Sequence, residues 1–416
     1  MKRTLGQWLD YQQQVHPTSI DLGLERVGDV ARRLGLGRPA RRVATVAGTN
    51  GKGSTVAYLE AIARAAGWKV GAYTSPHLLR YNERVRINGA EAGDEALVAA
   101  FERIEAARGE LPLTYFEFGT LAALCLFEAA GLDLAILEVG LGGRLDATNI
   151  VDPDVAVITT IDLDHQDWLG DDREAIGGEK AGILRAGKPC VLAERDPPSS
   201  VLRRAYMLGA YAIRGHADYL IDELDDGRWR WREPGWQIEL PPPAMQAPAQ
   251  RENAAAAIAA LRALDLPLPD QAIVAGVAAA RVPGRLQRLP GRPERVLDVA
   301  HNAQGARQLA AWLQAQPRPT VAVFSALADK DIAALAGPLA GLVQAWHLGP
   351  ITDAGRRGLS AAALAERLAG VVPGERLRRH ASLGEALAAA TAEAGEDGRV
   401  LVFGSFHTVA EALGKD

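Results

Sequence analysis

The chain has 416 residues, more than one hydrophobic core usually supports, so we expect two domains. Hydrophobic residues make up 48% and charged residues 23%, the proportions of an ordinary globular protein, which exclude extensive disorder. A net charge of -5 gives no broad basic field and argues against nucleic acid and anionic membrane as partners.

The amino-terminal residues 1–11 contain no continuous apolar stretch of the kind found in signal peptides. Elsewhere no apolar run approaches the ~20 residues needed to span a bilayer. Of the two cysteines, Cys125 and Cys190, the first lies in the apolar run 121–130, where we expect a buried free thiol. These features predict a protein of the reducing cytoplasm.

The first half of the chain alternates between expected strands and helices. Residues 42–47 predict a buried strand, followed by a glycine-rich loop at 48–53 and a helix over 54–66. Further strands are expected at 134–139, 155–161 and 189–193, and further helices at 94–108 and 114–130. This alternation predicts a mainly parallel sheet with helices on both faces. Residues 211–240 differ, because short polar strands around 228–231 predict antiparallel hairpins before an alanine-rich helix over 252–264.

A helix-breaking Pro283-Gly284 pair precedes a new alternating series and predicts the domain junction. We therefore expect domains at 1–284 and 285–416. In the second, strands are expected at 296–300, 320–324, 344–348 and 400–403, with helices that include 303–314 and 383–394. The predicted fold class is α/β: a P-loop domain on a mainly parallel sheet, and a smaller, Rossmann-like doubly wound domain at the carboxyl end.

The glycine-rich loop 48–54 lies between the first expected strand and the helix after it. Backbone N–H groups and the helix dipole in such a loop can hold an anionic phosphate. Lys52 would reach the β- and γ-phosphates, and the Ser54 hydroxyl could bind the Mg²⁺ that bridges them. Val46 stands where the usual motif begins with glycine, and Gly53 separates Lys52 from Ser54, so an ordinary GTPase is disfavoured. A glycine turn without a ligand is the alternative.

Glu138 places a carboxylate inside an apolar strand, directly before the glycine-rich turn 140–143. Burying a carboxylate is costly unless it is paired or bound to a metal. The carboxyl end of a strand is where open α/β sheets bind ligands, so Glu138 could bind Mg²⁺. An internal salt bridge with Arg144 or another cation is the alternative.

Two further residues stay ambiguous from the pattern alone. His165 follows a strand in an acidic loop and could bind a second metal, but a lone histidine in such a loop is more often a hydrogen-bonded surface residue. Lys180, judged by its spacing, would be a solvated cation on a helix. On the pattern alone we therefore favour a surface role for His165 and a solvated side chain for Lys180.

A series of short motifs runs through the chain in a fixed order. They are Asp21-Leu22-Gly23-Leu24-Glu25-Arg26, the loop Thr49 to Ser54, Ser75-Pro76-His77, Thr114-Tyr115-Phe116-Glu117-Phe118-Gly119, Glu138 to Asn149, His165, Glu179-Lys180-Ala181-Gly182, Pro283-Gly284-Arg285, Asp298-Val299-Ala300-His301-Asn302 and Gly404-Ser405-Phe406-His407-Thr408-Val409-Ala410. This series resembles the bifunctional dihydrofolate synthase and folylpolyglutamate synthase family, which belongs with the Mur ligases. The resemblance covers nearly the whole chain.

The resemblance implies a role for each matching residue. The metal ligands would be Ser75, Glu138 and His165, beside Ser54 of the phosphate loop. ATP would contact Thr49, Asn50, Gly51, Lys52, Gly53, Ser54, Asn253, Arg285 and Asp298. Catalytic roles would fall to Lys52, to Lys180 as a carbamylated lysine, and to His301 and Ser405 near glutamate. The pterin site would comprise Asp21, Leu22, Gly23, Leu24, Thr114, Tyr115, Phe116, Glu117, Leu145, Asp146 and Ala147. The loop 326–331 departs from the family pattern, and we assign it no chemical role.

The implied activity is that of an ATP-dependent carboxylate–amine ligase. It would add L-glutamate to 7,8-dihydropteroate and to the γ-carboxylate of tetrahydrofolates, through an acyl phosphate. ATP would be the co-substrate with two Mg²⁺ ions, and a monovalent cation is a further candidate. We expect a cytoplasmic monomer with no nucleic acid and no membrane among its partners.

Two other functions are weighed against this one. A Mur-type ligase that uses a nucleotide-sugar carboxylate is disfavoured by the pterin-site segments, and a nucleotide-switched binding protein is disfavoured by the buried Glu138. Trp229, Trp231 and Trp236, with arginines between them, could stack on nucleic acid. At this net charge we favour a solvated hairpin face instead.

Overall fold

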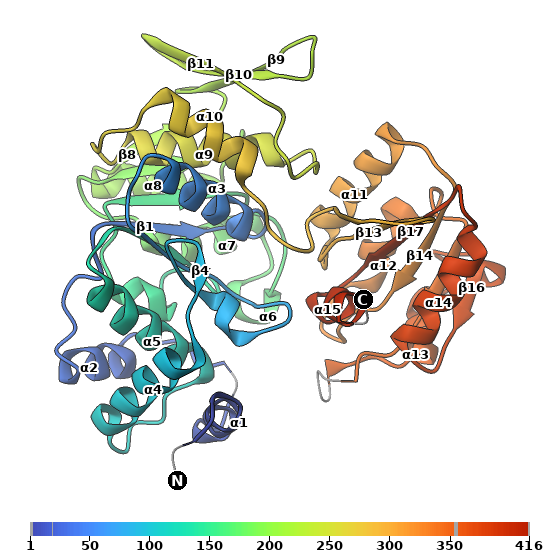
Figure 1. Ribbon diagram of the computed structural model, residues 1–416, viewed down its shortest axis with the longest axis horizontal. Coiled ribbons are helices and arrows are strands. Elements are labelled where there is room, and N and C mark those ends of the chain that lie inside the picture. The colour runs from blue at the N-terminus through green and yellow to red at the C-terminus, as the bar shows by residue number, and fades with distance from the viewer. Residues whose placement is uncertain (1–2, 19, 353–356, 415–416) are drawn as a thin grey trace. The chain divides into compact units, whose positions relative to one another are not determined.

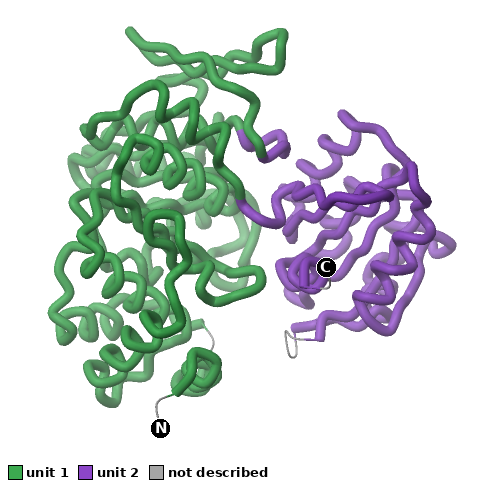
Figure 2. The backbone as a smooth tube through the Cα atoms, viewed as in Figure 1, with its two compact units in different colours: residues 1–244, 251–281 green, residues 245–250, 282–416 purple. Residues whose placement is uncertain are grey.

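The computed structural model describes residues 3–18, 20–352 and 357–414. Contacts within the chain divide it into two compact units, coloured separately in Figure 2. Unit 1 comprises residues 1–244 and 251–281, and unit 2 comprises residues 245–250 and 282–416. None of the helices in the described part of the chain has both the length and the apolar character needed to cross a membrane.

Unit 1 is built on an eight-stranded sheet with the order β4-β3-β2-β5-β1-β6-β7-β8. The strands are β1 (Ala40–Ala47), β2 (Val70–Tyr73), β3 (Val85–Ile87), β4 (Ala90–Glu91), β5 (Leu132–Glu138), β6 (Val155–Ile158), β7 (Pro189–Leu192) and β8 (Tyr211–Arg214). Every neighbouring pair in the series β2-β5-β1-β6-β7-β8 is parallel, whereas β3 pairs antiparallel with both β2 and β4. The predicted mainly parallel sheet is confirmed.

Two strand predictions in this unit need correction. The expected strand 155–161 ends at Ile158, because the hydroxyls of Thr159 and Thr160 turn toward the loop after β1 and both donate to the carbonyl of Asn50. Residues 211–214 were expected among antiparallel hairpins, but they form β8, a parallel edge strand beside β7. The contact of Thr159 and Thr160 with Asn50 and the pairing of β8 with β7 both join segments that are distant in the sequence, so a local pattern does not predict them.

Helices cover both faces of this sheet (Figure 1). They are α1 (Leu5–Val15), α2 (Glu25–Arg33), α3 (Lys52–Ala65), α4 (Asp94–Arg108), α5 (Tyr115–Ala130), α6 (Gln166–Leu169), α7 (Arg173–Lys180), α8 (Ser199–Leu208), α9 (Gln250–Arg262) and α10 (Asp270–Ala279). Figure 1 shows α2, α4 and α5 on one side of β1 and α3, α9 and α10 on the other.

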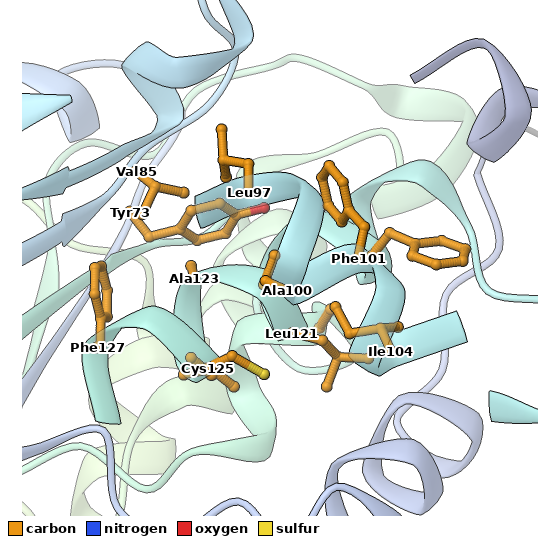
Figure 3. Packing of buried hydrophobic residues seen from close by; sticks show 14 of the residues in the cluster. Tyr73, Val85, Leu97, Ala100, Phe101, Ile104, Leu121, Ala123, Cys125 and Phe127 are labelled. Atoms are coloured by element: carbon orange, nitrogen blue, oxygen red, sulfur yellow. The ribbon is translucent and has the colours of Figure 1, made fainter. Parts of the chain in front are cut away.

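The largest core of unit 1 lies under α1, α2, α4 and α5. It joins Phe101 and Phe118 of these helices to strand residues such as Tyr73 and Leu137. Cys125 packs inside this cluster, as Figure 3 shows, and both cysteines of the chain are buried free thiols. The prediction for Cys125 is confirmed.

A three-stranded antiparallel sheet, β9 (Leu220–Glu223), β10 (Trp229–Glu233) and β11 (Trp236–Leu240), lies beyond α9 and α10 (Figure 1). The hairpin prediction is correct, but the prediction of a solvated tryptophan face is wrong. Trp229 and Trp231 are fully buried, and the Trp231 indole Nε1 donates to the Ala255 carbonyl of α9 at 3.2 Å. Stacking of these two rings on nucleic acid is excluded for the same reason. The alanines of α9 leave the space that the indoles fill.

Unit 2 contains a six-stranded sheet with the order β12-β13-β17-β14-β15-β16. Its elements are β12 (Gln287–Leu289), β13 (Glu294–Leu297), α11 (Ala303–Ala315), β14 (Thr320–Phe324), α12 (Ile332–Ala336), β15 (Ala345–Leu348), α13 (Ala361–Arg367), β16 (Leu377–Arg379), α14 (Leu383–Ala394), β17 (Arg399–Phe403) and α15 (Phe406–Leu413). Only β12 is antiparallel. The predicted smaller Rossmann-like sheet is confirmed, although the expected strand 296–300 ends at Leu297.

Candidate active site

Four neighbouring parallel strands of unit 1, in the order β2-β5-β1-β6, carry predicted site residues at their carboxyl ends. Ser75 follows β2, Glu138 ends β5, the phosphate loop follows β1, and His165 lies in the loop after β6. The register makes these ends level, because Val46 of β1 pairs with Glu138 on one side and Ala47 pairs with Ile158 on the other. Open α/β sheets bind ligands at such an edge.

The phosphate loop is fixed by hydrogen bonds to the segment after β6. The Thr49 amide donates to the Thr160 carbonyl at 2.6 Å, and the Thr49 hydroxyl donates to the Asp162 carbonyl at 3.0 Å. The Thr159 hydroxyl donates to the Asn50 carbonyl at 2.6 Å. The Asn50 amide also donates to the Thr160 hydroxyl at 3.2 Å, so both the amide and the carbonyl of Asn50 tie the loop to this segment.

Gly51 and Asn253, both predicted ATP contacts, lie side by side. Gly51 is the N-cap of α3 with φ 88°, a left-handed conformation that glycine adopts without strain. A Cβ atom at Gly51 would lie only 2.5 Å from Oδ1 of Asn253, which belongs to the first turn of α9. The loop and α9 therefore meet at a point where no larger residue fits.

The Lys52 ammonium folds back over the phosphate loop. Its Nζ donates to the carbonyls of Gly48 at 2.9 Å and Thr49 at 3.2 Å. Ser54 is buried in the first turn of α3, whose first backbone hydrogen bond runs from Thr55 N to Gly51 O. A cation, helix amides and a hydroxyl thus share one small loop, which is the chemistry that a nucleotide phosphate requires.

Glu138 is buried at the end of β5, and one of its carboxylate oxygens accepts the Ser75 amide at 3.3 Å. The salt bridge to Arg144 considered above does not form, because the Arg144 guanidinium binds Glu179, with Nη2 2.9 Å from Oε1. Two predicted metal ligands on neighbouring strands are therefore in contact.

The loop after Glu138 is closed by Asp146. Its carboxylate accepts the amides of Gly140 at 2.9 Å and Leu141 at 3.0 Å, and both the amide and the hydroxyl of Thr148 at 3.0 and 2.7 Å. Burial raises the pKa of Asp146 above its usual value, while these hydrogen bonds act in the opposite direction. Asp146 sets the shape of this loop, and its predicted contact with a pterin stays a prediction.

Lys180 is a buried lysine at the end of α7, and the expectation of a solvated cation is wrong. The loop after Glu138 lies directly on it, since a Cβ atom at Gly143 would be 3.0 Å from the Lys180 carbonyl. Burial, with a smaller contribution from the charge of Lys52, lowers the pKa of Lys180 to about 7, whereas Asp164 and Asp146 act to raise it. A substantial share of the Lys180 amines is therefore neutral at physiological pH.

His165 is the N-cap of the short helix α6 and has a left-handed conformation with φ 51°. Its amide donates to Oδ1 of Asp164 at 2.9 Å, and its ring Nε2 lies 3.9 Å from the same oxygen. Asp164 thus lies near both His165 and Lys180. Metal binding by His165 stays a prediction.

Arg26 joins two of the predicted pterin segments. Its Nη1 donates to Asp21 Oδ2 at 2.5 Å and its Nε donates to Glu117 Oε2 at 2.9 Å. Glu117 in turn forms a capping box with Thr114 at the start of α5. His16 also approaches Asp21, with 3.2 Å between Nε2 and Oδ2. The two carboxylates are therefore largely committed to protein partners.

The other predicted pterin residues lie partly beside the loop after Glu138 and partly in the core. The Phe116 ring lies against the backbone of Gly140, so this segment reaches the loop after Glu138. Tyr115 packs on Tyr81 with ring centroids 5.6 Å apart. Ala147 is part of the core cluster. Leu22, Gly23, Leu24 and Leu145 are half-buried.

The predicted residues of unit 2 form a group of their own at the carboxyl ends of β13 and β17. Asp298 accepts the amides of Leu286 and Ala300 at 2.9 and 2.8 Å, while its own amide donates to the Val402 carbonyl at the end of β17 at 3.0 Å. Burial raises the pKa of Asp298, while the nearby charge of Arg285 lowers it.

Phe406 connects the remaining members of this group. The Arg285 guanidinium lies 5.4 Å from the Phe406 ring, and the His301 ring lies 5.9 Å from it. Ser405 is the N-cap of α15: its hydroxyl accepts the Thr408 amide at 3.0 Å and lies 2.7 Å from the Thr408 hydroxyl. A capping role thus occupies the Ser405 hydroxyl.

Sequence reasoning missed several residues that shape the site. Arg26 lies within the first motif of the chain and in the first turn of α2, but no role was expected of it. Thr160, Thr159 and Asp164 had no sequence signal, because their contacts join segments that are far apart in the chain.

The donor set suits a divalent ion held together with phosphate. Within the described ranges, no group of three or more His, Cys, Asp or Glu side chains forms a ready metal cage. One buried carboxylate, Glu138, with the hydroxyl of Ser54 nearby in the phosphate loop, fits the way Mg²⁺ is bound through few protein ligands and substrate phosphates.

Comparison with known proteins gives consistent matches along the chain. The Mur ligase middle domain matches residues 46–261, and the Mur ligase glutamate ligase domain matches residues 284–406. The dihydrofolate synthase/folylpolyglutamate synthase of Escherichia coli K12 is 48% identical over 412 residues, which is 98% of this chain and 94% of that protein.

Solved structures agree with this match. The structure of Escherichia coli FolC in complex with DHPP and ADP superposes with a TM-score of 0.94 at 47% identity, covering 99% of this chain and 97% of the other. A bifunctional folylpolyglutamate synthase/dihydrofolate synthase with Mn, AMPPNP and L-glutamate bound gives a TM-score of 0.91 at 48% identity, covering 99% and 98% of the two chains.

Proposed function

The chain belongs to the dihydrofolate synthase/folylpolyglutamate synthase family of Mur-type ligases, and from this premise we propose how its residues divide the reaction. It is an ATP-dependent ligase that joins L-glutamate to 7,8-dihydropteroate and to the γ-carboxylate of tetrahydrofolates. The observation that carries the proposal is the convergence of the phosphate loop, Glu138 and the buried Lys180 at one edge of the sheet.

ATP is bound by the loop 48–54, with Lys52 over its β- and γ-phosphates. We propose that Asn253 contacts the nucleotide from α9 and that Arg285 and Asp298 contact it from unit 2. The divalent metal would be Mg²⁺, with two ions at the site. Their protein ligands would be Ser54, Ser75, Glu138 and His165. When bound, the metal neutralises charge on the transferring phosphoryl group.

The chemistry follows from the need to make a carboxylate electrophilic. The carboxylate oxygen of the pterin substrate attacks the γ-phosphorus of ATP, the bond to the β,γ-bridging oxygen breaks, and ADP leaves an acyl phosphate. Lys52 stabilises the charge that develops on the phosphoryl oxygens. The neutral amine of glutamate then attacks the acyl carbon, and the tetrahedral intermediate expels phosphate.

Lys180 would serve this site as a carbamate. A neutral amine is needed to capture carbon dioxide, and the lowered pKa of Lys180 supplies it. Carbamylation turns a buried cation into an anion that can hydrogen-bond or bridge near the metal. The proximity of the Lys52 charge supports this role, because it favours the anionic product.

In unit 2 we propose that His301 and Ser405 orient glutamate. His301 is the better candidate for direct contact, since the Ser405 hydroxyl is occupied at the N-cap of α15 and would act by fixing that helix. Residues 1–284 would form the ATP- and pterin-binding part, and 285–416 the glutamate-ligase part. We further propose a cytoplasmic monomer, consistent with the two free thiols, and a monovalent cation beside the metal site.

The proposed activity predicts that ADP release requires a carboxylate substrate. Without dihydropteroate or a tetrahydrofolate, no group in this scheme accepts the phosphoryl, so ATP turnover should fall to background. Coupled measurement of ADP, with mass spectrometry of the products, tests this. Chelation of the divalent metal should abolish both products, and added Mg²⁺ should restore them. ATP turnover at full rate without any carboxylate would refute the ligase assignment.

A second prediction concerns the two substrates. Asp21→Ala should lower dihydrofolate formation about tenfold while glutamate addition to tetrahydrofolate stays within about twofold, because each substrate must present a different carboxylate to one γ-phosphate. Both products are assayed side by side. Asp29→Ala is the matched control, since Asp29 pairs with Arg32 on the same segment, away from Glu117. Equal losses in the two reactions of Asp21→Ala would remove the idea of separate pterin pockets.

A further inference from the structure

The first turn of α9 carries Asn253, and its position relative to the phosphate loop leaves little tolerance. Oδ1 of Asn253 occupies the space in which a Cβ atom at Gly51 would stand, at 2.5 Å. Asn253 is itself buried. A shift of α9 by a fraction of this distance would either press on the loop or open a gap beside it.

A polar contact next to Asn253 joins this turn to the turn after β8. Glu252 Oε2 lies 3.1 Å from Nε2 of His216, which stands in the turn directly after β8. Nδ1 of the same ring lies 3.4 Å from Nη2 of Arg195, in the loop after β7. The contact therefore joins α9 to the carboxyl ends of two parallel strands of the main sheet.

The His216 ring lies between Arg195 and Glu252. A guanidinium can only donate, so the Arg195 contact requires Nδ1 to be the acceptor. The proton then sits on Nε2, which donates to the Glu252 carboxylate. The turn itself is stiff: the Arg214 amide donates to the Asp218 carboxylate at 2.8 Å, and the Gly215 amide donates to the Leu192 carbonyl at 2.8 Å. His216 is therefore held in a fixed position, in which it contacts Glu252 of α9.

We propose that His216 and Glu252 are positioning residues for ATP, which hold the first turn of α9 so that Asn253 stays against the phosphate loop. Neither side chain takes part in phosphoryl transfer. The proposal rests on the proposed function, because it assumes that the loop and Asn253 bind ATP. Loss of His216 or Glu252 weakens the binding of ATP and leaves the chemical step intact.

Steady-state kinetics with varied ATP test this, with glutamate and dihydropteroate saturating. For His216→Ala and for Glu252→Ala, which removes the acceptor, we expect KM for ATP to rise about fivefold, the order expected for one partly exposed hydrogen bond to a charged group, with kcat within about twofold. His216→Gln keeps a donor at similar reach and should restore a KM close to that of the unmodified protein.

A matched control lies one residue away on the same helix. Arg251 forms an ion pair with Glu223 of β9, whose side chain is 80% exposed, so Glu223→Gln should leave KM for ATP unchanged. Thermal unfolding provides a second readout. The melting temperature without nucleotide should be similar for all variants, while the increase produced by ADP with Mg²⁺ should be smaller in His216→Ala and Glu252→Ala.

The possible results distinguish a failure of the positioning role of His216 and Glu252 from a failure of the proposed ligase function. An unchanged KM in both variants, or a lower melting temperature without a change in KM, would show that the pair is only structural. An equal rise in KM in Glu223→Gln would show that any loosening of α9 suffices, and would also overturn the assignment. No ATP-dependent product from the unmodified protein would instead contradict the proposed function itself.

Discussion

Replacement of Lys52 by alanine should lower kcat/KM about a thousandfold, equivalent to about 4 kcal/mol of lost transition-state stabilisation. The Lys52 ammonium stands over the phosphate loop, where it donates to the carbonyls of Gly48 and Thr49 at 2.9 and 3.2 Å. Its charge is placed to offset the negative charge that spreads over the phosphoryl oxygens during transfer. Both ligase reactions use the same γ-phosphate, so both should be lost to the same extent.

The stability of the Lys52→Ala protein should change little by comparison. The side chain is half-buried and is not part of an apolar cluster, so its removal creates no large cavity. Thermal unfolding checks this beside the kinetics. Lys69→Ala is the control, because Lys69 is exposed at the amino end of β2, away from the strand ends that carry the site. A folded Lys52→Ala protein with full activity would reject the proposed role.

Lys180→Ala should lose activity at least about a hundredfold, and millimolar acetate should restore part of it. In this proposal the buried side chain works as a carbamate, so a small carboxylate that enters the space left by the lysine replaces its anionic end. Lys180→Arg should be as inactive as the alanine variant, since a guanidinium stays cationic and cannot be carbamylated. Acetate should have no effect on Lys52→Ala, which separates specific rescue from a general salt effect.

The pH dependence of this modification follows from the lowered pKa. With a pKa of about 7, most Lys180 amines are protonated at pH ~6 and most are neutral at pH ~8. Only the neutral amine reacts with carbon dioxide, so carbamylation and activity should both rise with pH across this window. Mass spectrometry of the native protein and ¹³C NMR with labelled bicarbonate measure the occupancy. An activity that is independent of bicarbonate and of acetate in the variants would contradict the carbamate.

The sequence by itself determined the features that depend on near neighbours in the chain. The alternation of apolar runs gave β14 and the helices α4 and α14 at their observed bounds, because hydrophobic periodicity and capping residues are local. The phosphate loop was equally readable, since its glycines, lysine and hydroxyl lie within seven residues. The order of the motifs predicted the family.

Tertiary structure decided what each polar group contacts. Nothing local distinguishes Lys180 from a solvated lysine; its lowered pKa comes from burial under the loop after Glu138 and from the charge of Lys52, far away in the sequence. Asp146 could be assigned to a pterin from its motif, yet its carboxylate closes its own loop through four hydrogen bonds.

The same distinction explains the errors in strand length and exposure. The strand that begins at Val155 stops early because the hydroxyls of Thr159 and Thr160 donate to the carbonyl of Asn50, more than a hundred residues away in the sequence. Trp231 is buried because the alanines of α9 leave space for its ring. Desolvation and hydrogen bonding between distant segments depend on which surfaces meet, and a linear pattern does not contain that information.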